Sequence, residues 1–331
     1  MLTTRPPPFT LPSKDPADKV RDVTLPAAQA SSQPVIWPVP RSCYLCASMR
    51  LSLRFRARGV PGPDEAQAYN CTSFGHRNHP PIWVCDDCGM MFQWPMKSQR
   101  DLVHAYEGVE DPLYVQEKQN RYLTFRRLLK ILGPGQGRSL LDVGAYCGYF
   151  LDVAREGGFE AEGLELSRWA GAQARSLGFT IHGESLEQRP GNARYDVITL
   201  WDVIEHFADP REELKAVFRL VKPGGRAYLS TIDVGSLFAR VMGAHWPWLM
   251  DMHLFYFDRS TLAVLAQEVG FKVQAIHDYT HTVSSDYLLR KAAASFTPLA
   301  PIFSLARRVL PKSIPVPVNL GDNMLMVLER P

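Results

Sequence analysis

The 331-residue sequence lacks the features that mark membrane-spanning, exported or strongly charged proteins. It has no uninterrupted apolar run of about 18 residues, so we expect no membrane-spanning helix. Its N-terminus has no apolar signal-peptide core, which favours a cytoplasmic location. The net charge is only +3, so no overall field indicates a nucleic acid or a membrane as partner. In a reducing compartment the six cysteines are metal ligands or free thiols more often than disulfides.

Composition divides the chain into four parts. Residues 1–40 hold nine prolines and few aliphatic clusters, which predicts a disordered leader, although a start codon assigned too far upstream explains the segment equally well. Residues 41–100 hold five of the six cysteines. Residues 101–138 form a helical connector, because "RYLTFRRLLKIL" repeats apolar residues at helical spacing. Residues 139–331 form the largest domain, with aromatic and helical insertions at 235–258 and 282–320.

Strands and helices alternate through that domain. We expect strands at 139–143, 161–165, 179–182, 195–200, 226–231, 271–277 and 323–328. We expect helices near 148–157, 168–177, 210–221 and 260–269, the third beginning at Asp209-Pro210 and ending at "KPGG". Such alternation predicts an α/β fold with a mostly parallel sheet and helices on both faces.

The first strand leads into the turn "DVGAYCGYF", which has the outline of a nucleotide-binding turn without its second glycine. Tyr146 stands at that position, and a phosphate nest needs a close backbone approach there. A ligand without phosphates is therefore favoured, and S-adenosylmethionine (SAM) fits. Acidic residues after successive strands support a cationic ligand, since carboxylates would repel a pyrophosphate. These residues are Asp142, Glu165, Glu184, Asp202 and Glu205.

The blocks "LLDVGAYCGYFLDVA", "AEGLELSRWAGAQARSLG", "YDVITLWDVIEHFADP" and "VKPGG" together resemble class I SAM-dependent methyltransferases. The resemblance covers about residues 120–331 and is closest to the branch that includes ubiquinone O-methyltransferases. It implies a Rossmann-like seven-stranded sheet with an antiparallel last strand. It also implies a role for each matching residue: Gly144 and Gly148 line the methionine part of the cofactor, Glu165 binds the ribose, Glu184, Ser185 and Leu186 flank the adenine, and Trp201 and Asp202 close the pocket.

Two CxxC pairs, Cys43/Cys46 and Cys85/Cys88, can supply four thiolates to a structural Zn²⁺ ion. The alternating sequence "RLSLRFRAR" predicts a strand between the pairs, as in a zinc ribbon. The arrangement resembles the zinc-binding N-terminal module fused to many methyltransferases of the same branch. Cys71, His76 and His79 lie between the pairs, and we expect them to be loop residues.

Methyl transfer to a hydroxyl needs a residue that accepts the acceptor's proton. His206 and His253 are the candidate general bases, with His245 behind them, because each lies near the expected crevice. The expected reaction is methylation of a small-molecule or sugar acceptor, O-methylation being favoured. Two alternatives stay open: a nicotinamide-dependent oxidoreductase, and a nucleic-acid- or protein-binding zinc module on a catalytically retired domain. The sequence indicates no oligomeric state.

Overall fold

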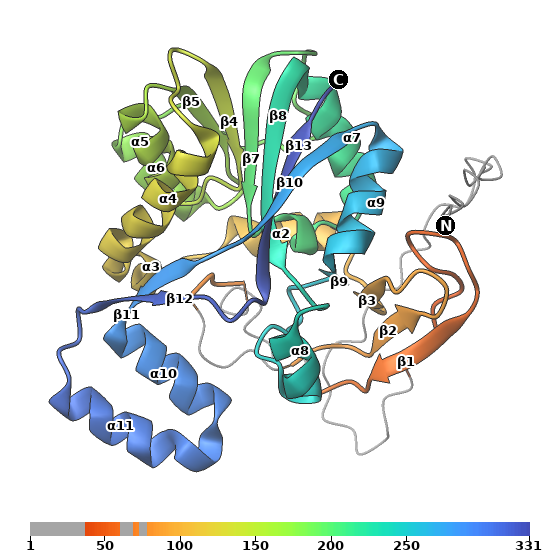
Figure 1. Ribbon diagram of the computed structural model, residues 1–331, viewed down its shortest axis with the longest axis vertical. Coiled ribbons are helices and arrows are strands. Elements are labelled where there is room, and N and C mark those ends of the chain that lie inside the picture. The colour runs from red at the N-terminus through yellow and green to blue at the C-terminus, as the bar shows by residue number, and fades with distance from the viewer. Residues whose placement is uncertain (1–36, 60–68, 73–77) are drawn as a thin grey trace, which may run out of the picture.

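The computed structural model describes residues 37–59, 69–72 and 78–331 (Figure 1). The leader expected over 1–40 lies outside the described residues except for its last four positions, and His76 lies outside them too. Within the described part, no helix is long and apolar enough to cross a membrane.

Seven strands form the central sheet in the order β10-β13-β8-β7-β4-β5-β6. They are β4 (Ser139–Val143), β5 (Glu160–Leu164), β6 (Ile181–His182), β7 (Tyr195–Trp201), β8 (Val221–Ile232), β10 (Lys272–Asp278) and β13 (Asn323–Glu329). β4 pairs in parallel with β5 and β7, whereas β13 is antiparallel to both of its neighbours. The expected Rossmann-like, mostly parallel sheet with an antiparallel last strand is confirmed.

Helices cover both faces of this sheet, as expected. Consecutive residues of β4 point to opposite faces: Leu140 packs in one hydrophobic cluster and Leu141 in another. The cluster around Leu140 includes residues of α4 (Lys118–Leu132), α5 (Tyr149–Glu156) and α6 (Arg168–Ser176). The cluster around Leu141 includes residues of α7 (Pro210–Leu220) and α9 (Arg259–Val269). Burial on both faces explains why the parallel strands read as continuous apolar runs.

The helical connector begins earlier than its apolar pattern and is broken twice. α2 (Gln99–Glu107) is capped by Ser98, whose side chain accepts a hydrogen bond from the Asp101 amide. α3 (Pro112–Gln116) begins at Asp111-Pro112, and the Asp111 side chain caps it in the same way. α4 then follows directly. A proline at the first helical position restarts a helix, which divides the pattern.

The cysteine-rich part builds a four-stranded sheet in the order β1-β2-β3-β9. Its strands are β1 (Leu51–Phe55), β2 (Ile82–Cys85), β3 (Met91–Gln93) and β9 (Phe255–Tyr256). β9 comes from the 235–258 insertion and pairs Phe255 with Phe92. The sheet is therefore completed by a strand from the large domain, and Cys43, Phe92 and Leu141 belong to one hydrophobic cluster.

Two insertions extend one end of the molecule, at the bottom of Figure 1. The first carries α8 (Leu237–Met242) and the 3-10 helix η2 (Gly243–His245). The second starts from a ribbon of β11 (His281–Ser284) and β12 (Pro315–Val318) and carries α10 (Ser285–Ser295), η3 (Thr297–Leu299) and α11 (Ala300–Val309). α10 and α11 pack on each other as a hairpin beyond the edge of the sheet.

Candidate active site

A cavity of about 450 Å³ opens at the carboxyl ends of the parallel strands, where α/β sheets place their ligands. Ten of the site residues expected from the sequence line it: Asp142, Gly144, Glu165, Glu184, Ser185, Leu186, Trp201, Asp202, His206 and His253. Gly148 is not among the lining residues. The structure thus brings together residues from four strand ends and from the 235–258 insertion.

The turn after β4 takes three left-handed residues in alternation: Gly144 at φ +71°, Tyr146 at φ +46° and Gly148 at φ +75°. A Cβ on Gly144 would lie 2.8 Å from Val203 Cγ2, and one on Gly148 would lie 2.8 Å from Ala174 Cβ. Both glycines are therefore required by packing as well as by φ. Gly148 caps α5 and packs against α6, which explains its distance from the cavity.

Tyr146 adopts the conformation of the glycine that it replaces. Its backbone N–H donates to Glu165 Oε2 at 2.7 Å, and its ring packs edge-on against Tyr114, with ring centroids 4.5 Å apart. A non-glycine residue at positive φ is uncommon and costs conformational energy. The hydrogen bond to Glu165 and the ring contact offset that cost, so the turn keeps its shape without a second glycine.

Two buried carboxyl groups lie at the ends of adjacent strands. Asp142 Oδ1 accepts a hydrogen bond from Thr199 Oγ1 at 2.7 Å. Glu165 accepts backbone hydrogen bonds from Tyr146 and from Ser167 N, the latter at 2.6 Å. Burial raises the pKa of Asp142 to about 8 and that of Glu165 to about 7. Nearby positive charge would favour the ionised forms, so this end of the cavity suits a cationic ligand with hydroxyl donors.

A second acidic pair follows β7. Asp202 has φ +55°, and its Oδ1 accepts a hydrogen bond from Ser230 Oγ at 2.7 Å. Glu205 is 1 % exposed, and its Oε2 has no hydrogen-bond partner among the described residues. Burial, and then the charge of Asp202, raises the pKa of Glu205 to about 8. Strained backbone and an unpaired carboxyl oxygen beside a cavity are features of functional sites.

His206 and His253 face each other, with ring centroids 4.9 Å apart. His206 Nδ1–H donates to the Met252 carbonyl at 2.8 Å, and His253 Nδ1–H donates to the Trp248 carbonyl at 2.9 Å. These bonds leave the lone pair of each neutral ring on Nε2. Burial lowers the pKa of His206, which favours the neutral form that can accept a proton.

Glu205, His206 and His253 also offer ligand atoms that lie within 4.8 Å of one another. This donor set suits either proton transfer or a divalent cation. His245, the weaker candidate, lies in η2 and is not among the residues that line the cavity.

Two polar lining residues that were not expected from the sequence are Arg121 and His281. Arg121 of α4 lies over the Tyr114 ring, with its Cζ 4.7 Å from the ring centroid, and its Nε has no hydrogen-bond partner among the described residues. His281 of β11 places Nε2 3.7 Å from Asp202 Oδ2. Arg121 lies in a segment whose apolar periodicity indicated only a helix, and His281 lies next to the predicted insertion. No local sequence motif identifies either residue as part of a site.

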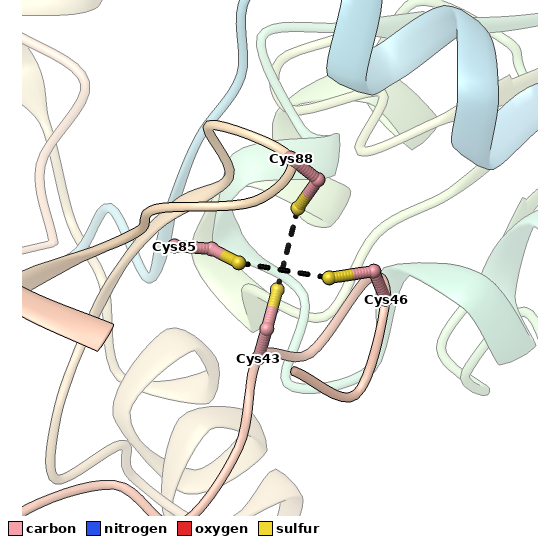
Figure 2. Close-up of side chains that lie close together, drawn as sticks. All are labelled: Cys43, Cys46, Cys85 and Cys88. Carbon is pink, nitrogen blue, oxygen red and sulfur yellow. Dashed lines mark hydrogen bonds between the residues drawn. The ribbon is translucent and has the colours of Figure 1, made fainter. Parts of the chain in front are cut away.

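The cysteine cluster lies apart from the cavity lining. Figure 2 shows the four sulfur atoms of Cys43, Cys46, Cys85 and Cys88 converging on one point. The Sγ atoms of Cys43 and Cys88 are 3.5 Å apart, and those of Cys46 and Cys85 are 3.6 Å apart. Four thiolates around Zn²⁺ at about 2.3 Å would be separated by roughly 3.8 Å in a tetrahedron. The residues therefore fit a tetrahedral zinc ion.

Parts of this chain are similar to a protein-family model and to several known proteins. A family model described as a methyltransferase domain matches residues 115–276. The ubiquinone biosynthesis O-methyltransferase of Pseudomonas paraeruginosa is 32 % identical over 163 residues, which span 44 % of this chain and 69 % of that protein. The protein of the same name from Pseudomonas aeruginosa LESB58 is 29 % identical over the same shares. The crystal structure of the YcgJ protein from Bacillus subtilis is 17 % identical, with a TM-score of 0.46, and covers 63 % of this chain and 99 % of that one.

The class of protein is therefore that of the methyltransferase-domain enzymes. More particularly, the chain belongs to the SAM-dependent methyltransferases. The nicotinamide-dependent oxidoreductase considered from the sequence is wrong, because the relatives are methyltransferases.

Ionisation of Glu165 gives the first prediction. Its pKa is raised in the folded state, so the protein loses stability as the pH rises from the unfolded value near 4.5 through 7. Compared with wild type, Glu165→Gln should therefore gain about 2–3 kcal/mol in free energy of unfolding between pH 4.5 and pH 7.5. Urea unfolding of the ligand-free protein at several pH values measures this difference.

The control is Glu110→Gln, at an exposed glutamate outside the cavity lining, and the difference for Glu165→Gln should depend on pH more steeply than the difference for this control. A pH-independent difference for Glu165→Gln would contradict the prediction.

Proposed function

We propose that the protein transfers the methyl group of SAM to a hydroxyl oxygen of a small-molecule or sugar acceptor. One observation carries the proposal: a single cavity joins buried carboxyl groups at the strand ends to two facing imidazoles. The O-methyltransferase names of the relatives support an oxygen acceptor. A small molecule is favoured over a macromolecule because the imidazoles lie inside the cavity and not on an open surface.

We infer the following arrangement for the cofactor. The backbone at Gly144 approaches the methionine part. The Arg121 guanidinium binds its carboxylate, since a cation whose buried Nε has no hydrogen-bond partner among the described residues suits an anionic group. The Glu165 carboxylate accepts the ribose hydroxyls. Gly148 does not contact the cofactor in this arrangement and contributes by keeping the turn after β4 in its conformation.

The adenine end of the cavity is formed by the segment after β6. Ser185 and Leu186 flank the base there. Glu184 stands beside them, although its carboxylate already accepts a hydrogen bond from Arg189 Nη1 at 2.9 Å. Trp201 and Asp202 close the pocket at the end of β7, where the Trp201 ring packs on Phe150 with centroids 4.9 Å apart.

SAM supplies an activated methyl group on a positively charged sulfur. The chain's own residues hold the acceptor hydroxyl in line with that methyl group and exclude water. The neutral Nε2 of His206 or His253 accepts the hydroxyl proton. Asp202 stabilises the positive charge that the His206 imidazole would then carry.

We further propose that Cys43, Cys46, Cys85 and Cys88 hold a structural Zn²⁺ ion. Burial raises the pKa of the Cys43 thiol to about 11, and a metal cation would reverse that shift by stabilising the thiolate. Four protein ligands leave no open coordination position, so the ion has no catalytic role.

The alternative of a catalytically retired domain predicts no turnover of SAM to S-adenosylhomocysteine, whereas the proposed function requires both binding and turnover. We expect calorimetry to show SAM binding whose affinity rises up to tenfold per pH unit between pH 6 and pH 7, as Glu165 ionises. Glu165→Gln should weaken binding and flatten this pH dependence. If folded wild-type protein gave no heat of binding with SAM, the proposed function would be wrong.

The histidine pair gives the third prediction. Of His206→Ala and His253→Ala, the variant that removes the base should lower methyl transfer by a factor of about 10²–10⁴ while SAM affinity is retained. The assay is release of S-adenosylhomocysteine with a panel of phenols, catechols and sugars. His245→Ala, outside the cavity lining, is the matched control and should turn over at the wild-type rate. Equal rates for all three variants would exclude a histidine base.

The metal proposal gives the fourth prediction. Purified wild-type protein should carry about one zinc ion per chain by elemental analysis, and Cys46→Ser/Cys88→Ser should carry almost none and unfold at a lower temperature. Cys71→Ser, outside the cluster, should retain its zinc. Zinc in the double variant at the wild-type level would show that the cluster is not the metal site.

A further inference from the structure

The α10–α11 hairpin is an insertion outside residues 115–276, the segment that the methyltransferase family model matches. The hairpin connects the two strands of the β11–β12 ribbon and lies beyond the central sheet, at the lower end of Figure 1. The surface of this insertion therefore needs an explanation of its own, because neither the central sheet nor the matched family segment accounts for it.

α11 exposes an apolar stripe. Ile302, Leu305 and Val309 are 63 %, 62 % and 76 % exposed, and their spacing of three and four residues places them on one face of the helix. Four further apolar side chains around the stripe are also exposed: Phe296, Leu299, Leu310 and Ile314. Single exposed apolar residues are ordinary, but seven of them within one insertion indicate an interaction surface.

The same insertion is strongly basic. Between His281 and Leu320 it contains five Lys and Arg residues and one acidic residue, Asp286. Asp286 is already paired with Arg290 at 2.8 Å and with Arg307 at 2.9 Å. Arg308 and Lys312, which flank the stripe in sequence, form no ion pair with any described residue. The exposed stripe is therefore bordered by two exposed cations that form no close ion pair with the described residues, although Lys312 acts on Asp286 at longer range.

We propose that the hairpin docks on an anionic lipid surface, with α11 lying in the plane of the interface. A short helix with an apolar face and cations beside it is the arrangement that binds such surfaces, and each Lys or Arg near the surface adds to the attraction. A second copy of the chain fits less well, because a twofold contact through the stripe would oppose the same cations. The sequence-based expectation of no membrane partner rested on the small net charge and on the lack of a membrane-spanning helix. Neither observation bears on a helix that lies flat on the membrane surface.

The position of the hairpin connects this surface with the cavity. Phe296 and Leu320 are partly exposed, and both also line the cavity. α10 contributes Tyr287 and Lys291 to the same wall. Docking would therefore bring the rim of the cavity to the lipid surface, whichever acceptor the enzyme methylates.

Vesicle flotation with the full-length protein tests the proposal. Wild type should float with vesicles of phosphatidylcholine containing phosphatidylglycerol and should bind pure phosphatidylcholine vesicles much more weakly. Arg308→Gln/Lys312→Gln should lower partitioning on the anionic vesicles roughly 25-fold, about fivefold for each charge removed. Leu305→Ser/Val309→Ser should abolish it. These positions are exposed, so circular dichroism should show wild-type folding.

Matched controls are Val264→Ser, an exposed apolar residue of α9, and Lys130→Gln/Lys272→Gln, two exposed cations elsewhere. Both should partition as wild type does. Absence of flotation, or flotation that the controls lower as much as the hairpin variants do, would overturn the proposal. So would sedimentation showing that wild type is a dimer and Leu305→Ser/Val309→Ser a monomer without vesicle binding, because the stripe would then join two copies.

Discussion

The pairing of β3 with β9 is the constraint on which the acceptor half of the cavity depends. It joins the cysteine-rich sheet to the segment that carries His253. Gln93 continues the contact, since its N–H donates to the Leu254 carbonyl at 3.0 Å and its Nε2 donates to the Asp251 carbonyl at 2.8 Å. The Leu254 N–H in turn donates to the Glu205 carbonyl at 2.8 Å. A continuous set of backbone contacts therefore runs from the cysteine knuckles to the loop after β7.

A second contact reinforces the first. In the knuckle, the Tyr44 hydroxyl donates to Asp209, which caps α7, and accepts a hydrogen bond from the Arg211 N–H at 2.7 Å. The Arg211 guanidinium in turn donates a hydrogen bond to the Leu45 carbonyl at 2.9 Å. Since α7 follows the loop of Asp202 and His206, Tyr44 of the knuckle holds the α7 end of that loop, and the Leu254 N–H holds its middle at Glu205. The module thus stabilises the part of the cavity that carries the two histidines, and the proposed cofactor side depends on the turn after β4.

Much of the fold could be predicted from the sequence because local signals and tertiary structure agree there. The central strands are apolar runs that need burial on both faces, and β4 begins and ends where expected. β8 differs: it begins at Val221 and continues through "KPGG", because Tyr195 of the neighbouring β7 pairs with Val221 before a bulge. The two-residue strand β9 could not be predicted, since only its pairing partner, distant in sequence, makes it a strand.

The site divides in the same way. Residues that follow strands, such as Glu165 and Asp202, could be placed in the cavity because parallel strands end at one edge of a sheet. Arg121 could not, because a polar residue on an amphipathic helix has the same sequence pattern whether it faces solvent or a cavity. Tyr146 shows that a side chain can also mislead a sequence-based prediction. A tyrosine at this position argued against a standard turn, yet its backbone takes the left-handed conformation and its N–H donates a hydrogen bond to Glu165. The turn after β4 is defined by its φ angles and its hydrogen bond to an acidic residue, so it tolerates a tyrosine where a glycine would be easier to accommodate.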